Sequence, residues 1–134
     1  MCIRDRTGCL TRVSFAKAPA VCGTGFHEVA PRKSDYALAS AAAQISFAAG
    51  SGVTSIHLGI GSVGDFPERL DVDQLCGTPL NNAAIADAVH AAMQMVETVE
   101  DLHATAAYRK RVATELAIRA LRDARDEISK DLNQ

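Results

Sequence analysis

Residues 36–60 read YALASAAAQISFAAGSGVTSIHLGI, and the fold depends on how this stretch is interpreted. Its second half predicts a strand over Val53–Ile60, because every second residue from Thr54 to Ile60 lies on one face and the residues between are small or polar. Immediately before it, Gly50-Ser51-Gly52 is typical of a tight turn. A strand after a tight turn predicts a hairpin whose first strand lies in the preceding segment.

That preceding segment, Tyr36–Ala49, carries two conflicting signals. Its alanines favour a helix, but only Ser34 or Asp35 could cap one. The hairpin needs a partner strand at this position, so we predict a strand here.

Two further strands are predicted closer to the amino terminus. Leu10–Phe15 alternates apolar and polar residues, which is typical of a strand with one buried face. Phe26–Ala30 follows the glycines at 23 and 25 and is closed by Pro31, which cannot donate to a sheet.

The second half of the chain predicts helices. Residues 61–79 are loop-like, with one short helical turn over 71–75. Asn81 or Asn82 can cap a helix that runs to about Thr98, and Thr105 can cap one that runs to about Ile128. The apolar stripes that these two helices are expected to bury comprise Ile85, Val89, Ala92, Val96 and Val99, and then Tyr108, Val112, Leu116, Ala120, Leu121, Ala124 and Ile128. Strands followed by helices predict an α+β fold, with an antiparallel sheet covered on one face.

Composition excludes several classes of protein. The chain has 134 residues, a net charge of −2 and 48% apolar residues, which fits one globular domain or part of one. No apolar run reaches the roughly 20 residues of a membrane span. The balanced charge also argues against a nucleic-acid partner, which would select a basic face.

The cysteines indicate the redox compartment of the protein, and the first residues indicate where its natural sequence starts. Four cysteines include no CxxC pair, so reduced thiols and a cytoplasmic location are expected. The opening MCIRDR resembles a translated sequencing adapter, so we treat residues 1–6 as an artefact within a leader of residues 1–9. The domain is then expected to occupy residues 10–134, as the carboxy-terminal part of a longer protein.

Three motifs have simpler structural explanations. Gly59–Gly64 matches GxGxxG, but Asp65-Phe66-Pro67 follows where a nucleotide-binding turn needs a helix, so a structural loop is expected. The basic run Arg109-Lys110-Arg111 is expected to be a solvated helix face. The histidines at 27, 57, 90 and 103 are too dispersed to predict a metal site, and His57 should lie opposite the apolar face of its strand.

Tyr36 is the residue with the most open interpretation. Aromatic residues make up only 4% of the chain, and this one follows a charged turn at the mouth of the predicted hairpin. A flat ring in that position could stack on a ligand, and the alternative is a tyrosine in the core or at its rim.

Three blocks of sequence occur in an order and spacing that resemble a known family over roughly residues 10–125. The blocks are FHE at 26–28 with RKSDYA at 32–37; LG at 58–59 with Val63, Pro67, Arg69 and LCGTPL at 75–80; and DLHAT at 101–105 with YR at 108–109 and RAL at 119–121. They resemble the carboxy-terminal domain of the FAD-binding medium subunit of molybdenum hydroxylases, the group of carbon monoxide dehydrogenase and xanthine dehydrogenase. The resemblance implies a three-stranded antiparallel sheet packed against a small helical bundle.

The resemblance also implies a function in electron transfer. FAD in such a subunit takes electrons from iron–sulfur clusters on a small subunit, while the substrate is oxidised at the molybdopterin of a large subunit. Tyr36 matches the family's aromatic residue that shields the flavin ring, with Asp35 and Lys33 shaping its turn. The glycine-rich loops that hold the FAD phosphates have no counterpart here, so the fragment is not expected to be active alone. The alternative is a noncatalytic α+β module that acts only through subunit contacts.

Ser34 departs from the family pattern, which has glycine at that position. Glycine adopts positive φ readily and serine does so rarely, so the sequence leaves the backbone of this turn open.

Overall fold

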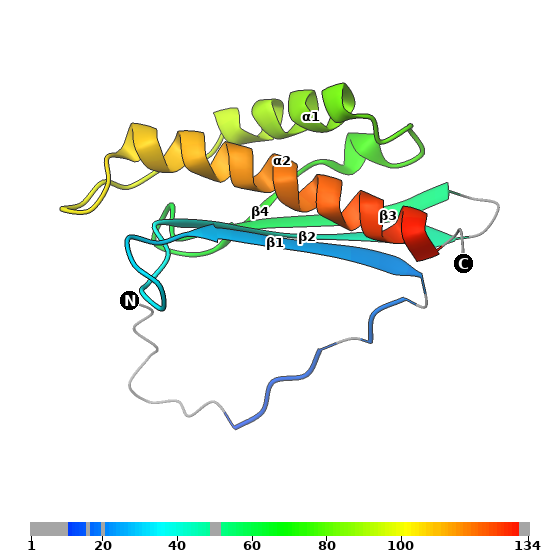
Figure 1. Ribbon diagram of the computed structural model, residues 1–134, viewed down its shortest axis with the longest axis horizontal. Helices are drawn as coiled ribbons and strands as arrows, with labels where there is room; N and C mark the ends of the chain where they lie inside the picture. The colour runs from blue at the N-terminus through cyan, green and yellow to red at the C-terminus, as the bar shows by residue number, and fades with distance from the viewer. Residues whose placement is uncertain (1–10, 16, 20, 49–51, 132–134) are drawn as a thin grey trace.

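The computed structural model describes residues 11–15, 17–19, 21–48 and 52–131, and its strands and helices form two layers (Figure 1). One layer is an antiparallel sheet, and the other is a pair of helices on one face of it. The arrangement confirms the predicted α+β class with strands first and helices after them. None of the helices in the described ranges is both long and apolar enough to cross a membrane.

The sheet has four strands in the order β1-β2-β3-β4, each antiparallel to its neighbour. Their bounds are β1 Cys22–Val29, β2 Ala39–Ala48, β3 Gly52–Gly61 and β4 Glu68–Leu70. β2 and β3 form the predicted hairpin, in which Ala41 lies opposite Ile60 and Ile45 opposite Ile56. The alanine-rich segment is therefore a strand from Ala39 onward, as the hairpin argument predicted, whereas residues 36–38 belong to the preceding loop and Ala49 lies outside the described residues.

Two predictions about strands were wrong. Leu10–Phe15 was expected to be a strand, but residues 11–15 form none and are exposed, and Leu10 lies outside the described residues. Alternation makes a segment compatible with a sheet, but a strand also needs a neighbour to pair its backbone groups. In the other direction, the three-residue β4 pairs with β3 within a stretch expected to be loop, so the sheet has four strands and not three.

Both helices begin where the capping residues predicted. α1 spans Asn82–Gln94, and the Asn81 side chain accepts a hydrogen bond of 2.8 Å from the Ala84 amide. α2 spans Ala106–Asp131, and the Thr105 hydroxyl accepts a hydrogen bond of 3.2 Å from the amide of Tyr108. The short helical turn is also present as the 3₁₀ helix Asp73–Leu75.

α1 ends at Gln94, four residues before the predicted end, and α2 supplies the reason. The Lys110 ammonium donates to the carbonyl oxygens of Gln94 and Val96, at 3.4 and 3.0 Å. These contacts satisfy carbonyl groups that the end of a helix leaves unpaired, so the chain can leave the helix there.

The core lies between the sheet and the helices. Alternate residues of β2 and β3 face the helices, and those of the apolar stripe on α2 face the sheet. Its largest fully buried side chains are Ile45, Ile56, Leu58, Ile60, Val63, Val72, Ile85, Val89 and Leu121. The sheet face away from the helices stays open to solvent.

β1 and α2 approach each other more closely than side chains would allow. A Cβ atom on Gly23 would overlap the backbone carbonyl of Ala124, and one on Gly25 would overlap that of Ala120. The two glycines lie two residues apart on the same face of β1, so both are turned toward the helix. Glycine is therefore required here for helix–strand packing.

Gly25→Ala tests this packing. Because the added methyl group would meet rigid helix backbone, we expect the free energy of unfolding to fall by about 3 kcal/mol. The matched control is Gly59→Ala on β3, where a Cβ would lie 3.7 Å from its nearest neighbour, the Glu68 carbonyl oxygen. Urea unfolding of the two variants measures both changes, and equal losses would contradict the proposed contact.

Candidate functional site

A cavity of about 380 Å³ lies at the end of the sheet where three loops meet. The loops are residues 30–38 between β1 and β2, residues 62–67 after β3, and residues 95–105 between the two helices. The loops are far apart in sequence, so the cavity exists only because the sheet and α2 bring them together. It is the place where the structure gathers the residues singled out from the sequence.

The structure brings two of the three predicted site residues to this cavity. Asp35 and Tyr36 line it, while Lys33 is exposed in the same turn and is not part of its wall. The Tyr36 side chain is 93% exposed, which excludes a core position for this tyrosine. The Asp35 carboxylate accepts a hydrogen bond of 2.9 Å from the Tyr36 amide, so it fixes the backbone from which the ring projects.

The backbone beside Tyr36 is strained. Ser34 has a φ of 67°, so it keeps the left-handed conformation that glycine adopts readily. Among the described residues, Ser62 is the other non-glycine residue with positive φ, at 62°, and it lines the same cavity. Such strain costs about 1–2 kcal/mol per residue and concentrates at functional sites.

A buried arginine joins the three loops. Arg109 lies in the first turn of α2 and is only 5% exposed. Its Nη1 donates to the carbonyl oxygens of Leu38 and Ser62, at 2.6 and 2.7 Å, and its Nη2 donates to the Asp101 carboxylate at 2.6 Å. Each acceptor belongs to a different loop, so one guanidinium group links all three.

Asp101, the partner of Arg109, is itself held by several hydrogen bonds. Its carboxylate accepts hydrogen bonds from the amides of His103 and Ala104, at 2.8 and 3.0 Å, in addition to the pair with Arg109. The His103 amide and then the Arg109 side chain favour the ionised form and lower the pKa of Asp101 to about 2. The carboxylate therefore stays ionised throughout the neutral range.

The expectation of a solvated basic run was wrong for two of its three members. Arg109 is buried, and Lys110 binds the end of α1, whereas Arg111 is exposed and lies over the Tyr108 ring at 5.8 Å from its centre. The sequence did carry a usable signal. Arg109 begins the i, i+4 series that continues through the fully buried Ala113 and Ala117, one position away from the predicted stripe.

The histidines do not converge on one place. His27 Nε2 lies 2.8 Å from the Asp123 carboxylate on α2, whereas His57, His90 and His103 are exposed on three different segments. His57 lies opposite the apolar face of its strand, as predicted. In the ranges that the structure describes, no group of three His, Cys, Asp or Glu side chains is placed to hold a metal ion. Cys22 and Cys76 are free thiols, and the two earlier cysteines lie outside those ranges.

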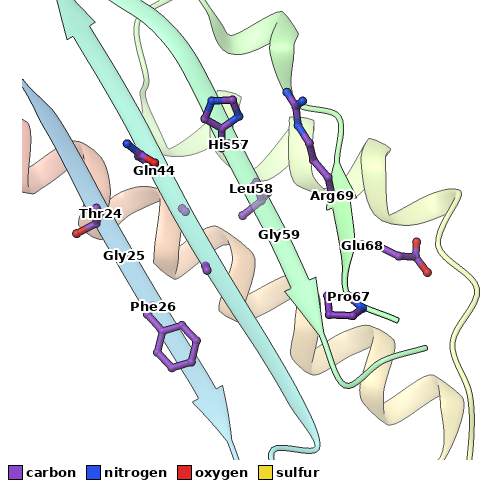
Figure 2. Close-up of a pocket in the computed structure, with 12 residues that line it drawn as sticks. Thr24, Gly25, Phe26, Gln44, His57, Leu58, Gly59, Pro67, Glu68 and Arg69 are labelled. Carbon is purple, nitrogen blue, oxygen red and sulfur yellow. The ribbon is translucent and has the colours of Figure 1, made fainter. Parts of the chain in front are cut away.

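The open face of the sheet carries a larger cavity, of about 710 Å³ (Figure 2). The strand register places Phe26, Ala42, Gly59 and Arg69 in one row across the four strands. Since Ala42 and Gly59 are small, the middle of the row is low, and the Phe26 ring stands at one edge, 62% exposed. Sequence reasoning did not find this cavity, because it depends on register across strands.

Comparisons with known proteins agree with the resemblance found in the sequence. The sequence model of the family described as CO dehydrogenase flavoprotein C-terminal domain matches residues 24–124. A search of curated protein sequences finds no significant match.

Solved structures with the same fold include two carbon monoxide dehydrogenases. The enzyme from Hydrogenophaga pseudoflava that lacks the Mo-pyranopterin moiety matches with a TM-score of 0.71 and 25% identity, and the reconstituted enzyme from Oligotropha carboxidovorans with 0.70 and 26%. Quinoline 2-oxidoreductase from Pseudomonas putida 86 matches with a TM-score of 0.70 and 26% identity. The matches cover 80–82% of this chain but only 38–39% of the structures' own chains.

Ser34→Gly tests the strained turn. Glycine carries no penalty at positive φ, so we expect the free energy of unfolding to rise by about 1 kcal/mol. The matched control is Ser55→Gly within β3, where the extra freedom of glycine should lower it by about 0.5–1 kcal/mol. Urea unfolding distinguishes the two, and a loss of stability in Ser34→Gly would contradict a left-handed Ser34.

Asp101→Asn tests the ion pair through its pH dependence. The pKa of Asp101 is lower in the folded protein than its ordinary value of 3.8, so its contribution is fully present above about pH 4 and disappears as the pH falls toward 2. We expect wild type to be more stable than the variant at pH 7, with a difference that shrinks between pH 4 and pH 2. A difference that stays constant over this range, measured by urea unfolding, would rule out the lowered pKa.

Proposed function

Because this chain belongs to the CO dehydrogenase flavoprotein C-terminal domain family, we propose that it serves in the FAD-binding electron-transfer subunit of a molybdenum hydroxylase, where its Tyr36 turn covers the flavin ring. The observation that carries the proposal is the position of Tyr36. Its ring is 93% exposed beside a cavity, although aromatic side chains usually bury most of their surface. An exposed ring on a fixed turn is suited to stacking on a planar ligand.

The turn that carries Tyr36 is held at its base beside the cavity. The Leu38 amide donates to the Val29 carbonyl at 2.7 Å, so the turn that carries Tyr36 is closed at its base. A cavity of about 380 Å³ is in the range of small-molecule sites and could accept part of a flavin beside the tyrosine ring. In this proposal Tyr36 projects from a hydrogen-bonded turn, and its exposed ring is free to stack on the flavin.

In this proposal the domain positions the flavin ring and covers it, and the cofactor supplies the redox chemistry. Tyr36 would lie against the ring system, exclude water from that side and limit access of electron acceptors. Asp35 would hold the Tyr36 backbone through its hydrogen bond, and Lys33, next to it in the turn, would contribute positive charge at the rim.

The remainder of FAD would be held by an upstream part of the same subunit. A phosphate group binds readily where a glycine-rich loop opens a helix, and Gly59–Gly64 leads instead into bends that contain Asp65. We therefore assign the FAD phosphates to the upstream domain. The iron–sulfur small subunit and the molybdopterin large subunit are the partners that this function requires, in a cytoplasmic complex.

The second candidate is a module that contributes subunit contacts and no ligand site. One observation favours it: the open sheet face carries the 62% exposed Phe26 ring at the edge of the larger cavity. Aromatic residues are enriched at protein–protein interfaces. The two candidates differ in whether Tyr36 affects a bound flavin.

Tyr36→Ala in the complete subunit tests the proposal. The upstream reading frame is recovered, the whole subunit is co-expressed with its partners, and bound flavin is measured by absorbance and fluorescence. We expect the variant to retain flavin but to show brighter flavin emission and severalfold faster reoxidation, because the ring that covers the flavin is gone. Tyr36→Phe, which keeps an aromatic face, should remain close to wild type.

The matched control is Tyr108→Phe, which alters the chain's only other tyrosine, on α2. An intact wild-type subunit without flavin would leave the contact module as the function. Flavin that behaves identically in wild type and Tyr36→Ala would refute the covering role.

A further inference from the structure

We propose that Arg109 is a positioning residue. Its guanidinium binds the carbonyl groups of Leu38 and Ser62 and the Asp101 carboxylate, and so holds the strained Tyr36 turn in the conformation that exposes the ring. The role of the Tyr36 ring rests on the proposed function, whereas the role of Arg109 in holding the turn rests on the geometry alone. It assigns a role to a basic position that the solvated-face interpretation left without one.

The first argument is the geometry of the acceptors. Leu38 lies two residues after Tyr36, and its carbonyl oxygen accepts from Arg109 Nη1 at 2.6 Å. The Leu38 amide is already bonded to Val29, so both backbone groups of this residue are fixed. The carboxyl end of the Tyr36 turn therefore cannot move without breaking a bond to the arginine.

The second argument is the strain in the facing loop. Ser62 follows β3 directly and holds its left-handed conformation while its carbonyl oxygen accepts from the same Nη1 at 2.7 Å. A strained backbone persists only where its surroundings fix it. Arg109 provides that constraint, and it does so in the wall of the cavity beside Tyr36.

The third argument is the free-energy cost of burying the Arg109 guanidinium. A guanidinium that is 5% exposed loses most of its hydration, and its Nε has no hydrogen-bond partner among the described residues. Burying one charge of an ion pair is costly even when it is paired, and the Asp101 carboxylate that pairs with Arg109 stays 47% exposed. The next residues on the same face of α2 are alanines, so a helix selected only for packing would carry a small apolar residue here.

The fourth argument is that the three basic residues at 109–111 make different contacts. Lys110 binds Gln94 at the end of α1 and Val96 in the loop that follows, and Arg111 lies over Tyr108, so neither links all three loops as Arg109 does. Arginine also differs from lysine in chemistry, because its planar fork can bind two carbonyl groups and a carboxylate at once, whereas an ammonium group acts as a point charge. The role thus belongs to position 109 and to arginine.

The experiment compares Arg109→Lys with Ile128→Val. Ile128 is a buried residue near the other end of α2, so its variant lowers overall stability without touching the cavity. Hydrogen exchange of the 134-residue chain is measured at the Leu38 amide, and flavin emission and reoxidation are measured in the complete subunit. We expect Arg109→Lys to exchange about tenfold faster at Leu38 and to approach Tyr36→Ala in its flavin behaviour, and Ile128→Val to change neither readout.

Each outcome decides one question. Leu38 exchange that is equal in Arg109→Lys and Ile128→Val would overturn the positioning role, whatever the flavin does. Faster exchange in a subunit that binds no flavin would keep the positioning role and reject the proposed function. If Arg109→Lys does not fold, Asp101→Asn gives the same test, since it removes the charge that orients the guanidinium, and unchanged exchange there would overturn the proposal.

Discussion

The structure depends on the close contact between α2 and β1. Gly23 and Gly25 carry no side chain to separate the strand from the helix backbone, so the two elements meet directly. This contact fixes both the tilt and the longitudinal position of α2 over the sheet. Arg109 lies 11 residues before the contact at Ala120, about 16 Å along a helix that rises 1.5 Å per residue. The packing of the carboxy-terminal half of α2 thereby sets where Arg109, near the amino terminus of the helix, meets the loops.

The same helix also closes the exposed edge of the sheet. Glu127 accepts hydrogen bonds from the amide and the hydroxyl of Thr24, at 2.5 and 3.1 Å, and Asp123 pairs with His27. An open strand edge can pair with other chains, and the Glu127 carboxylate opposes that by occupying the Thr24 amide, while Asp123 binds the His27 side chain on the same strand. At the opposite edge, β4 is only three residues long, which limits pairing in another way. One long helix and one short strand protect both edges.

Much of this fold was predictable because its signals are local. The sequence Gly50-Ser51-Gly52, typical of a tight turn, together with the alternating strand after it predicted the hairpin. Asn81 and Thr105 marked where both helices begin. β4 escaped prediction because three residues are too few to show periodicity. Arg109 escaped because charge on a helix predicts solvent, whereas its partners are carbonyl groups that only the folded chain brings near. In the candidate site, sequence therefore identified the ring and missed what holds it.

The location of the strain bears on which function the fold serves. A domain selected for subunit contacts alone gains nothing from a left-handed backbone at positions 34 and 62, since an unstrained turn would serve it equally well. It also gains nothing from a buried arginine where alanine would pack. Ser62 and Arg109 line one cavity, and the turn beside it carries a tyrosine whose side chain is 93% exposed. Costs that concentrate around a single exposed ring favour selection for the position of that ring, which a planar cofactor requires and a contact surface does not.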